Sequence, residues 1–230
     1  MSKEKSILIS NFADTESYDR RIKKFVPYYE EMMNSVLNCF SEHESYLVVL
    51  ELGCGTGSLS QKILKRQGVF KLTAIDINEE MVKKCKENLS PYPARTEIIC
   101  ADMIGFRRLN YFDYVLSNLA LHYPSTNDKK ISVCRNVYES LRPGGIFSFS
   151  VMMTSESAES TERIWNHWEN DVLQGGVSRE ELDDWRRTHH GADHPVLPSL
   201  WLEWLRKLGF RPCELVWCET IFGTIWARKP

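Results

Sequence analysis

A glycine-rich turn beside an acidic residue is the part of this 230-residue sequence best suited to hold a nucleoside. Residues 51–57 read Glu-Leu-Gly-Cys-Gly-Thr-Gly and overlap the end of a continuous apolar run at 46–52. Glycines let a backbone pass very close to a ligand. The spacing is not the G-x-G-x-x-G of dinucleotide-binding proteins, and the carboxylate of Glu51 is a poor neighbour for a pyrophosphate. The turn therefore favours a cationic ligand.

Two further acidic residues end the next two predicted strands. Asp76 closes the run 70–76, where a carboxylate can accept hydrogen bonds from both hydroxyls of a ribose. Asp102 closes the run 96–102, close to where an adenine edge would lie. Parallel strands bring their carboxyl ends to one crevice. Glu51, Asp76 and Asp102 are therefore predicted to face a single nucleoside site.

The elements that must position these residues alternate along the chain. Apolar runs predict strands, and apolar positions at helical spacing predict helices between them. Pro27 interrupts the first helical stripe, so the segment 18–40 is predicted to form two helices, and Asn78 is a candidate N-cap. Strands alternating with helices imply an α/β fold with a parallel sheet covered on both faces. The strands are expected at 46–52, 70–76, 96–102, 112–118, 146–151, 213–219 and 222–228, and core helices near 58–66, 79–89 and 128–141.

Beyond residue 151 the pattern changes. The segment 152–210 is helical in pattern, acidic and aromatic, and all seven tryptophans of the chain fall between 165 and 226. We expect a helical cap over an acceptor pocket, within a single domain spanning 1–230. Its parts would be lid helices at 18–40, a cofactor-binding core at 46–151, the cap at 152–210 and an edge hairpin at 211–230.

Composition excludes several classes of protein. Hydrophobic content of 43%, charged content of 26% and a net charge of -2 describe an ordinary globular chain, without the basic excess of a nucleic-acid-coating protein. No apolar run is long enough for a membrane span, and the first ten residues show no export signal. Seven cysteines without C-x-x-C pairs predict free thiols in a reducing compartment. A cytoplasmic monomer or homodimer is expected.

In its central part the sequence resembles the class I S-adenosylmethionine-dependent methyltransferases. The resemblance covers 48–151 and is carried by VVLELGCGTGSLS (48–60), LTAIDINEEMVKKCKENL (72–89), IICADM (98–103), FDYVLSNLALHY (112–123) and LRPGGIFSFSV (141–151). It implies a Rossmann-like, seven-stranded, mostly parallel sheet with a reversed final hairpin. It also implies S-adenosyl-L-methionine as cofactor, S-adenosyl-L-homocysteine as product and no metal.

The same resemblance implies which residues bind the cofactor. Gly53, Cys54 and Gly55 would line its methionine part with Glu51 nearby, Asp76 would bind ribose, and Ile77 would pack on adenine. Asp102 and Met103 would recognise the adenine amino group, and Asn118 and Leu119 would flank the departing methyl. The remaining cofactor contacts expected in the core are Met81 and Ala101.

The N-terminal segment 18–32 and the C-terminal segment 209–229 resemble a narrower group, which contains carboxy-S-adenosylmethionine synthase and related small-molecule methyltransferases. In that group the N-terminal helices fold over the cofactor, which makes Tyr18, Arg21 and Tyr29 candidate lid residues. The arginine-bearing segment that the synthase uses for a carboxylated sulfonium is not recognisable between 152 and 195. This difference favours plain methyl transfer to a small-molecule acceptor. A carboxy-S-adenosylmethionine synthase, a tRNA-modifying methyltransferase and a non-catalytic binding module remain alternatives.

Residues on the acceptor side are less sharply defined. His122 follows the fourth strand and is a candidate general base, with packing beneath the loop as the alternative. The other candidate acceptor contacts are Tyr123, Trp165, Trp185 and His190. The tryptophans could equally belong to the core. His189, His190, Asp193 and His194 resemble metal ligands only superficially, because their spacing matches no zinc signature. The segment 117–123 also lacks the [DN]PP[YF] tetrad of base and glutamine N-methylation.

Overall fold

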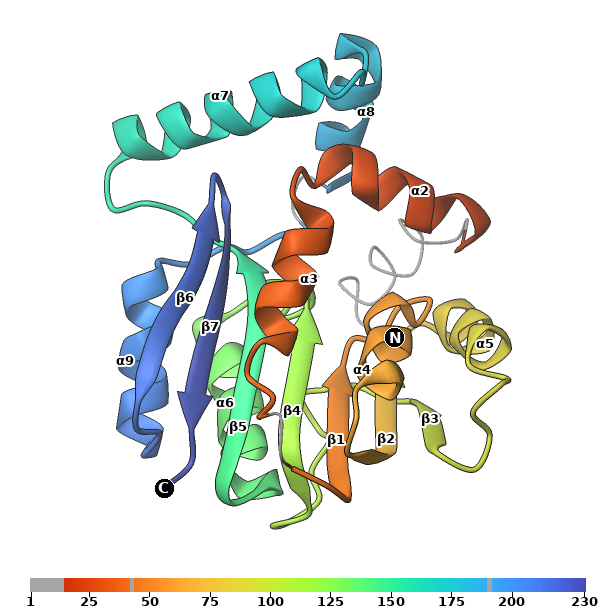
Figure 1. Ribbon diagram of the computed structural model, residues 1–230. Coiled ribbons are helices and arrows are strands. Elements are labelled where there is room, and N and C mark those ends of the chain that lie inside the picture. Colours follow the sequence, from red (N-terminus) through yellow and green to blue (C-terminus); the bar gives the residue numbers. More distant parts are fainter. Residues whose placement is uncertain (1–14, 42–43, 190–191) are drawn as a thin grey trace.

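A central seven-stranded sheet organises the computed structural model, which describes residues 15–41, 44–189 and 192–230. The strands lie in the order β3-β2-β1-β4-β5-β7-β6, and only β7 runs antiparallel to its neighbours (Figure 1). This confirms the predicted α/β fold with a mostly parallel sheet and a reversed final hairpin. The strands are β1 (Leu47–Leu52), β2 (Val69–Asp76), β3 (Thr96–Cys100), β4 (Phe112–Asn118), β5 (Leu141–Met152), β6 (Cys213–Glu219) and β7 (Phe222–Arg228).

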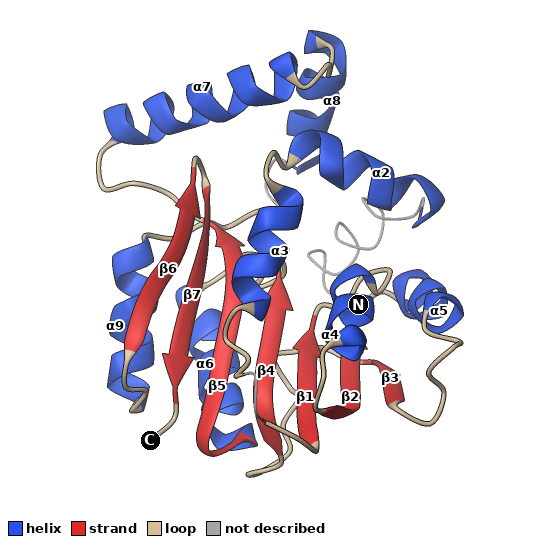
Figure 2. Ribbon diagram, viewed as in Figure 1, coloured by secondary structure: helices blue, strands red, loops and turns tan. Residues whose placement is uncertain are grey.

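Helices cover both faces of the sheet, as continuous apolar strands such as β1 require. On one face lie α3 (Tyr29–Leu37), α4 (Ser58–Lys65) and α5 (Glu79–Asn88), whose apolar side chains share one buried cluster (Figure 2). On the other lie α6 (Asn127–Ser140) and α9 (Pro198–Leu208), which share a second cluster. The sheet therefore has two separate cores, one on each side.

Three helices lie beyond the carboxyl ends of the parallel strands. They are α2 (Thr15–Phe25), α7 (Ala158–Gln174) and α8 (Arg179–His189), and in Figure 1 they lie above the arrowheads. The predicted cap at 152–210 thus divides between two places, because α9 packs against the sheet instead. The reason is its apolar stripe: Trp201 and Leu205 are completely buried in the core on the α6 side.

Local sequence explains where the helices near the site begin and end. α2 ends at Phe25 and α3 begins at Tyr29, so the break falls around Pro27 as predicted, with Tyr28 in the left-handed region at φ 63°. The side-chain oxygen of Asn78 accepts hydrogen bonds from the backbone N–H groups of Glu80 and Met81. Asn78 is therefore the N-cap of α5, and its position fixes how the chain leaves β2.

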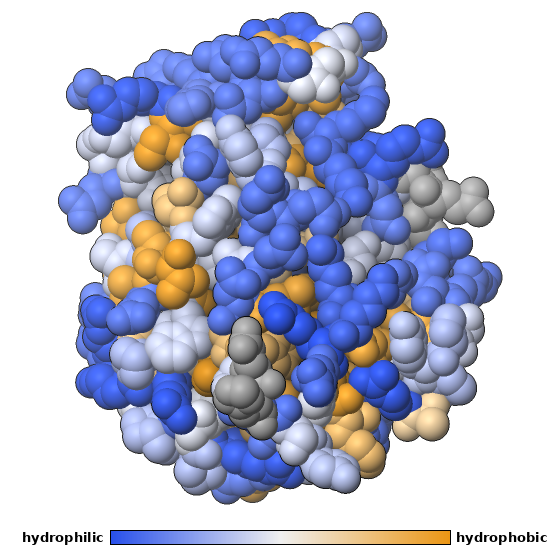
Figure 3. Space-filling view, in the orientation of Figure 1, coloured by the Kyte–Doolittle hydropathy of each residue, from blue (hydrophilic) through white to orange (hydrophobic). Residues whose placement is uncertain are grey.

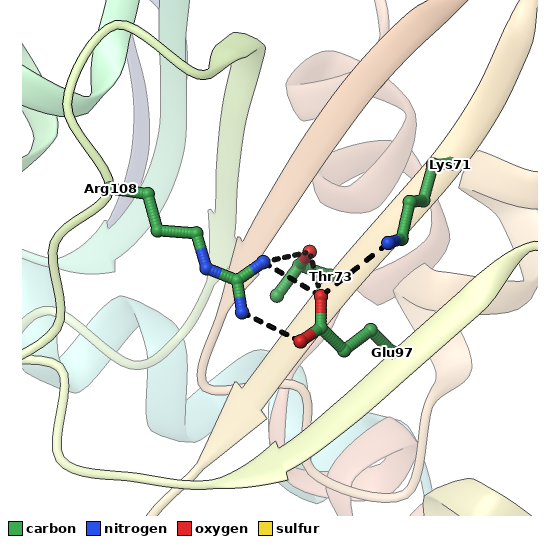
Figure 4. A network of polar contacts seen from close by, with 4 residues as sticks. All are labelled: Lys71, Thr73, Glu97 and Arg108. Atoms are coloured by element: carbon green, nitrogen blue, oxygen red, sulfur yellow. Dashed lines mark hydrogen bonds and ion pairs between the residues drawn. The ribbon is translucent and has the colours of Figure 1, made fainter.

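The connection from β3 to β4 contains no helix and is held by a polar network. Arg108 forms a two-pronged ion pair with Glu97 of β3, with N–O distances of 2.6 and 2.7 Å, and Lys71 of β2 lies 3.8 Å from the same carboxylate (Figure 4). Thr73 of β2 donates to Glu97 at 3.2 Å. Residues 101–111 include Asp102, so this network anchors a segment that forms part of the site described below.

Hydrophilic side chains dominate the face shown in Figure 3, where apolar side chains form scattered patches. Among the described helices, none is long and apolar enough to cross a membrane. All seven cysteines are free thiols, in agreement with their odd number and spacing.

The polar network predicts an acid-sensitive contribution to stability. Hydrogen bonds from Arg108 lower the pKa of Glu97 from 4.5 to about 2. A lowered folded-state pKa means that the stabilisation is complete above pH 4.5 and is lost as the pH falls toward 2. We expect Glu97→Gln to lower the free energy of unfolding at pH 7 by about 1 kcal/mol, a value discounted for solvent screening of this half-buried pair. Urea unfolding at several pH values measures the effect.

The matched control is Glu87→Gln. Glu87 pairs with Lys84 on the exposed surface of α5, so its replacement should change stability little. A loss for Glu97→Gln that stayed constant as the pH was lowered from 4.5 to 2 would contradict this explanation.

Candidate functional site

A cavity of about 290 Å³ opens at the carboxyl ends of β1, β2, β3 and β4. It lies where the strand order reverses between β1 and β4, which is where open α/β sheets bind ligands. Its volume is near the lower end of the ~300–1,000 Å³ typical of small-molecule sites. The predicted site residues that line it are Tyr18, Gly53, Gly55, Asp76, Ile77, Met81, Ala101, Asp102, Met103, Asn118, Leu119 and Tyr123.

The turn after β1 presents bare backbone to the cavity at Gly53 and Gly55, and at Gly53 there is no room for a side chain. Gly53 has φ +71°, and a Cβ there would lie 2.3 Å from the Cβ of Ala120. A side chain at Gly53 would therefore clash with Ala120. The backbone N–H groups of Gly53 and Cys54 both donate to the carbonyl of Ile75, at 2.8 and 2.9 Å. At Gly55, φ +52°, a Cβ would meet only the ring of Tyr18 at 4.0 Å. The bare backbone at Gly53 and Gly55 thus forms one wall of the cavity.

Asp76 connects this turn to the end of β2. Its Oδ2 accepts from the Gly55 N–H at 2.8 Å and its Oδ1 from the Asn78 N–H at 2.9 Å. Each carboxylate oxygen can accept a second hydrogen bond, so both can still receive a ribose hydroxyl. Burial raises the pKa of Asp76, and the two amide donors oppose this shift by stabilising the charged form.

The far wall of the cavity comes from the segment after β3. Asp102 Oδ1 accepts from the Ile104 N–H at 3.0 Å, which holds the side chain at the cavity. The apolar side chains of Ile77, Met81 and Met103 also line this part. A carboxylate among apolar groups can recognise the amino edge of a flat heterocycle while the rest of the ring is kept from water.

Glu51 and Cys54 lie behind the cavity and are not part of its lining. Glu51 is only 1% exposed, and its carboxylate accepts a hydrogen bond from the hydroxyl of Ser60 in α4. Burial raises the pKa of Glu51 well above its usual value, so its protonated form is favoured. Cys54 is buried against Cys85 of α5. Of the three strand-end acids, two therefore face the cavity, and the third supports the turn from beneath.

The helix α2 covers the cavity and is attached to the glycine turn. Asp19 accepts hydrogen bonds from the hydroxyls of Thr56 and Ser58, at 2.6 and 3.2 Å. This places the adjacent Tyr18 in the cavity wall. The other two candidate lid residues lie elsewhere: Arg21 is exposed, and Tyr29 is buried in the core beneath α2.

Contacts of Phe25 with Trp168 and Trp185, called the latch below, join α2 to the helical arm formed by α7 and α8. The indole N–H of Trp168 donates to the carbonyl of Phe25 at 2.9 Å, and the ring of Phe25 stacks on Trp185 at 5.6 Å. Trp165 packs edge-on against Trp168. Trp165 and Trp185, predicted as acceptor contacts, are thus not among the residues lining the cavity. They hold the lid from above.

The acceptor end of the cavity is formed by Tyr18, Asn118, Leu119 and Tyr123. Leu119 has φ +54°, and Ser150 of β5 donates to the side-chain oxygen of Asn118 at 2.5 Å, so the chain turns sharply here. His122, the candidate base, is 3% exposed and does not line the cavity. His190 lies outside the described residues.

Several lining residues were not predicted from the sequence. They are Ile75, Asn78, Ile104, Ala120, Pro124 and Lys129. Ala120 could have been inferred only from its packing against Gly53, and Lys129 carries no local signal. Within the described part of the chain, no three His, Cys, Asp or Glu side chains gather closely enough to bind a metal ion.

Comparisons with known proteins agree with this geometry. Residues 49–145 match the family model described as a methyltransferase domain. The carboxy-S-adenosyl-L-methionine synthase of Nautilia profundicola is 24% identical over 218 residues, covering 92% of this chain and 90% of the relative. That of Shewanella halifaxensis is 29% identical over 218 residues, covering 92% and 88%.

Solved structures share the fold. Phosphoethanolamine N-methyltransferase 2 of Haemonchus contortus, in complex with S-adenosyl-L-methionine, superposes with a TM-score of 0.74 at 13% identity, covering 100% of this chain and 60% of that one. The N-methyltransferase NodS of Bradyrhizobium japonicum, bound to S-adenosyl-L-homocysteine, gives 0.63 at 15% identity, covering 89% and 88%.

The sheet order and the cavity at its switch point are those of the class I S-adenosylmethionine-dependent methyltransferase fold, and residues 49–145 match a methyltransferase domain. The chain is an S-adenosylmethionine-dependent methyltransferase near the group that contains carboxy-S-adenosyl-L-methionine synthase. The cavity suits that cofactor in three respects. The backbone at Gly55 is bare, the carboxylate of Asp76 can accept hydrogen bonds from a ribose, and Asp102 lies among apolar side chains that can surround an adenine.

The hydrogen bonds of Asp76 predict a specific loss of cofactor affinity. Asp76→Asn replaces a charged acceptor by a neutral amide, and hydrogen bonds to charged groups contribute about 1.5–3 kcal/mol each. We therefore expect S-adenosylmethionine to bind about 10–100-fold more weakly by titration calorimetry. Asp128→Asn, on the exposed first turn of α6, is the control and should bind normally. Unchanged affinity in Asp76→Asn would contradict the proposed contact.

The latch predicts a kinetic effect. Trp168→Phe removes the hydrogen bond to Phe25 but keeps an aromatic ring, so α2 should open more often. We expect S-adenosylhomocysteine to dissociate about fivefold faster in stopped-flow measurements, because a hydrogen bond contributes about 1 kcal/mol. Trp201→Phe is the matched control, since that indole is equally buried but its N–H makes no hydrogen bond to any residue that the structure describes. Equal dissociation rates in the two variants would show that the latch does not retain the ligand.

Proposed function

We propose that this methyltransferase acts on a small-molecule acceptor, which enters between α2 and the loop that follows β4. The observation that carries the proposal is that aromatic side chains from two separate elements line the cavity at the end where an acceptor is expected. Tyr18 of α2 and Tyr123 of the loop both line it, and the latch to Trp168 keeps α2 in place above. A cavity of about 290 Å³ lined in this way suits a small molecule better than a segment of a polymer.

The protein's own contribution to catalysis is orientation and the exclusion of water. S-adenosylmethionine, when bound, supplies a methyl group on a positively charged sulphur. Asp76 and Asp102 hold the nucleoside end, and Asn118 and Leu119 shape the passage toward the acceptor. The lid attached through Asp19 keeps water away from the reacting atoms. Orientation alone can supply about 7–11 kcal/mol of catalysis in a two-reactant displacement.

The charges around the lid argue against a nucleic-acid acceptor. The basic run at 20–24 lies on α2, but Lys23 pairs with Glu30 at 2.8 Å and Lys24 lies 3.8 Å from Glu181 of α8. Two of the four basic side chains of the run are therefore paired with acids, so less positive charge is available to a polyanion there.

A carboxy-S-adenosylmethionine synthase-like reaction is the second candidate, favoured by the similarity to such synthases over 92% of the chain. A carboxylated sulfonium would need a cation near the acceptor end. Among the described lining residues Lys129 is the only lysine or arginine, and its ammonium donates to Ser125 at the start of α6. Arg21 is exposed on α2. Plain methyl transfer is therefore the better supported reaction.

We also propose that the protein is a cytoplasmic monomer or homodimer. Seven free thiols are compatible with a reducing cytoplasm, and either a monomer or a homodimer would leave the cavity complete, since all its described walls come from one chain.

The function is tested by incubating the purified chain with methyl-labelled S-adenosylmethionine and fractionated metabolite pools. We expect S-adenosylhomocysteine release that depends on a low-mass fraction, with the label recovered in a small molecule. Asp76→Asn should abolish the release at limiting cofactor. Mass spectrometry of the nucleoside that copurifies distinguishes the second candidate, because a carboxylated nucleoside would favour the synthase. Release only with a tRNA fraction would contradict the proposal.

A further inference from the structure

Asp193 lies beside the acceptor end although the sequence places it far from the cofactor core. The segment 192–197, between α8 and α9, packs along the ends of β4 and β5. The N–H of His194 donates to the carbonyl of His122 at 3.1 Å, and the N–H of Thr154 donates to the carbonyl of Val196 at 3.3 Å. These backbone contacts hold Asp193 against the loop that carries Tyr123.

His122 is oriented toward Asp193. Its Nδ1 accepts from the backbone N–H of Met152 at 3.4 Å, so in the neutral ring the proton is on Nε2. That nitrogen lies 3.5 Å from Oδ1 of Asp193. Because Nδ1 is an acceptor for Met152 and Nε2 faces a carboxylate, His122 is poorly placed to take a proton from an acceptor in the cavity. It is better placed to position Asp193.

The carboxylate of Asp193 is incompletely satisfied. Its Oδ1 is buried and makes no hydrogen bond to the part of the chain that the structure describes. Burial raises the pKa of Asp193 to about 7. A buried carboxylate in this state is stabilised either by taking up a proton or by pairing with a cation.

Tyr123 connects Asp193 to the cavity. Its side chain lines the acceptor end, and its pKa is raised well above the usual value by burial and by the nearby charge of Asp193. The phenol is therefore neutral and can both donate and accept a hydrogen bond. The ionisable groups around this point are His122 and Tyr123 from the loop after β4, His194 in the same segment as Asp193, Tyr18 from α2, and Asp76 from β2.

We propose that Tyr123 and Asp193 form an amine-binding subsite, in which the phenol of Tyr123 contacts the acceptor's protonated amine beside the position of the transferred methyl and passes a proton to Asp193 behind it. This inference rests on the proposed function and adds the chemical class of the acceptor. The charge near Tyr123 supports it, because the carboxylate of Asp193 lies close enough behind Tyr123 to raise the pKa of its phenol. His122 is a positioning residue that acts through Asp193.

The step balances without another reactant. The acceptor's ammonium transfers one proton to the phenol oxygen of Tyr123 while the phenol's own proton passes to the carboxylate of Asp193, which leaves a neutral amine with a free electron pair. That pair forms the new nitrogen–carbon bond while the carbon–sulphur bond breaks and its electron pair stays on sulphur. The products are a protonated methylamine and S-adenosylhomocysteine, and Asp193 returns its proton to water when the lid opens.

Sinefungin provides a probe that does not require the acceptor to be known. It is an analogue of S-adenosylmethionine in which a carbon bearing an amine replaces the methylated sulphur, so its ammonium lies next to the acceptor end. S-adenosylhomocysteine is the neutral reference. We expect calorimetry at pH 8 to show at least about tenfold tighter binding of sinefungin than of S-adenosylhomocysteine, as for a charge-assisted hydrogen bond.

Asp193→Asn should reduce this preference to about threefold or less while leaving the affinity for S-adenosylhomocysteine unchanged. Asp171→Asn is the matched control, because Asp171 also lies near a histidine and has a buried oxygen with no hydrogen bond to the described residues, but belongs to α7. It should keep the full preference. His122→Gln should reduce the preference partly, and more strongly near pH 7 than at pH 8.

Should Asp193→Asn fail to fold, the wild-type protein still provides a test. Its preference for sinefungin should fall as the pH is lowered through about 7, where Asp193 takes up a proton. A preference independent of both pH and Asp193 would overturn the amine subsite and leave the proposed function intact. Failure of the protein to bind either nucleoside would instead overturn the proposed function.

Discussion

The bond between Asp76 and the backbone of Gly55 is the contact on which the cofactor cavity depends. One carboxylate joins the turn after β1 to the start of α5, through the N–H groups of Gly55 and Asn78. A buried carboxylate is costly unless donors surround it, and here the donors are amides that the two turns leave unpaired. The same geometry leaves each oxygen able to accept one more hydrogen bond. Stability of the turn and binding of a ribose are thus two uses of one side chain.

The lid makes the cofactor site depend on parts of the chain outside the segment 49–145 that matches the methyltransferase family. Tyr18 enters the cavity because Asp19 binds the hydroxyls of Thr56 and Ser58, and because Trp168 holds the carbonyl of Phe25. The core therefore binds a nucleoside through features common to the class. The enclosure, which decides what else can enter, comes from the chain's N-terminal helices and its helical arm.

On the acceptor side, the surroundings of His122, Trp165 and Trp185 give these residues functions other than those their residue types suggest. His122 has the residue type of a general base, but its two ring nitrogens face Met152 and Asp193, while Asp193 has the less satisfied group. Trp165 and Trp185 have the residue types of an aromatic substrate wall, yet they stack above α2. In each case the side chain is suited to the expected chemistry, and its surroundings direct it to another task.

The sequence by itself determined the sheet and the nucleoside-binding edge. Buried parallel strands have continuous apolar runs in the sequence, and residues at their carboxyl ends lie near the crevice. Asp76 and Asp102 could therefore be placed at the cavity from the sequence alone. Only the tertiary structure decided that Glu51 points into the core toward Ser60, and that Asp193 lies beside His122. Both are contacts between separate elements, which depend on how helices and loops pack against the sheet. No local periodicity encodes that packing.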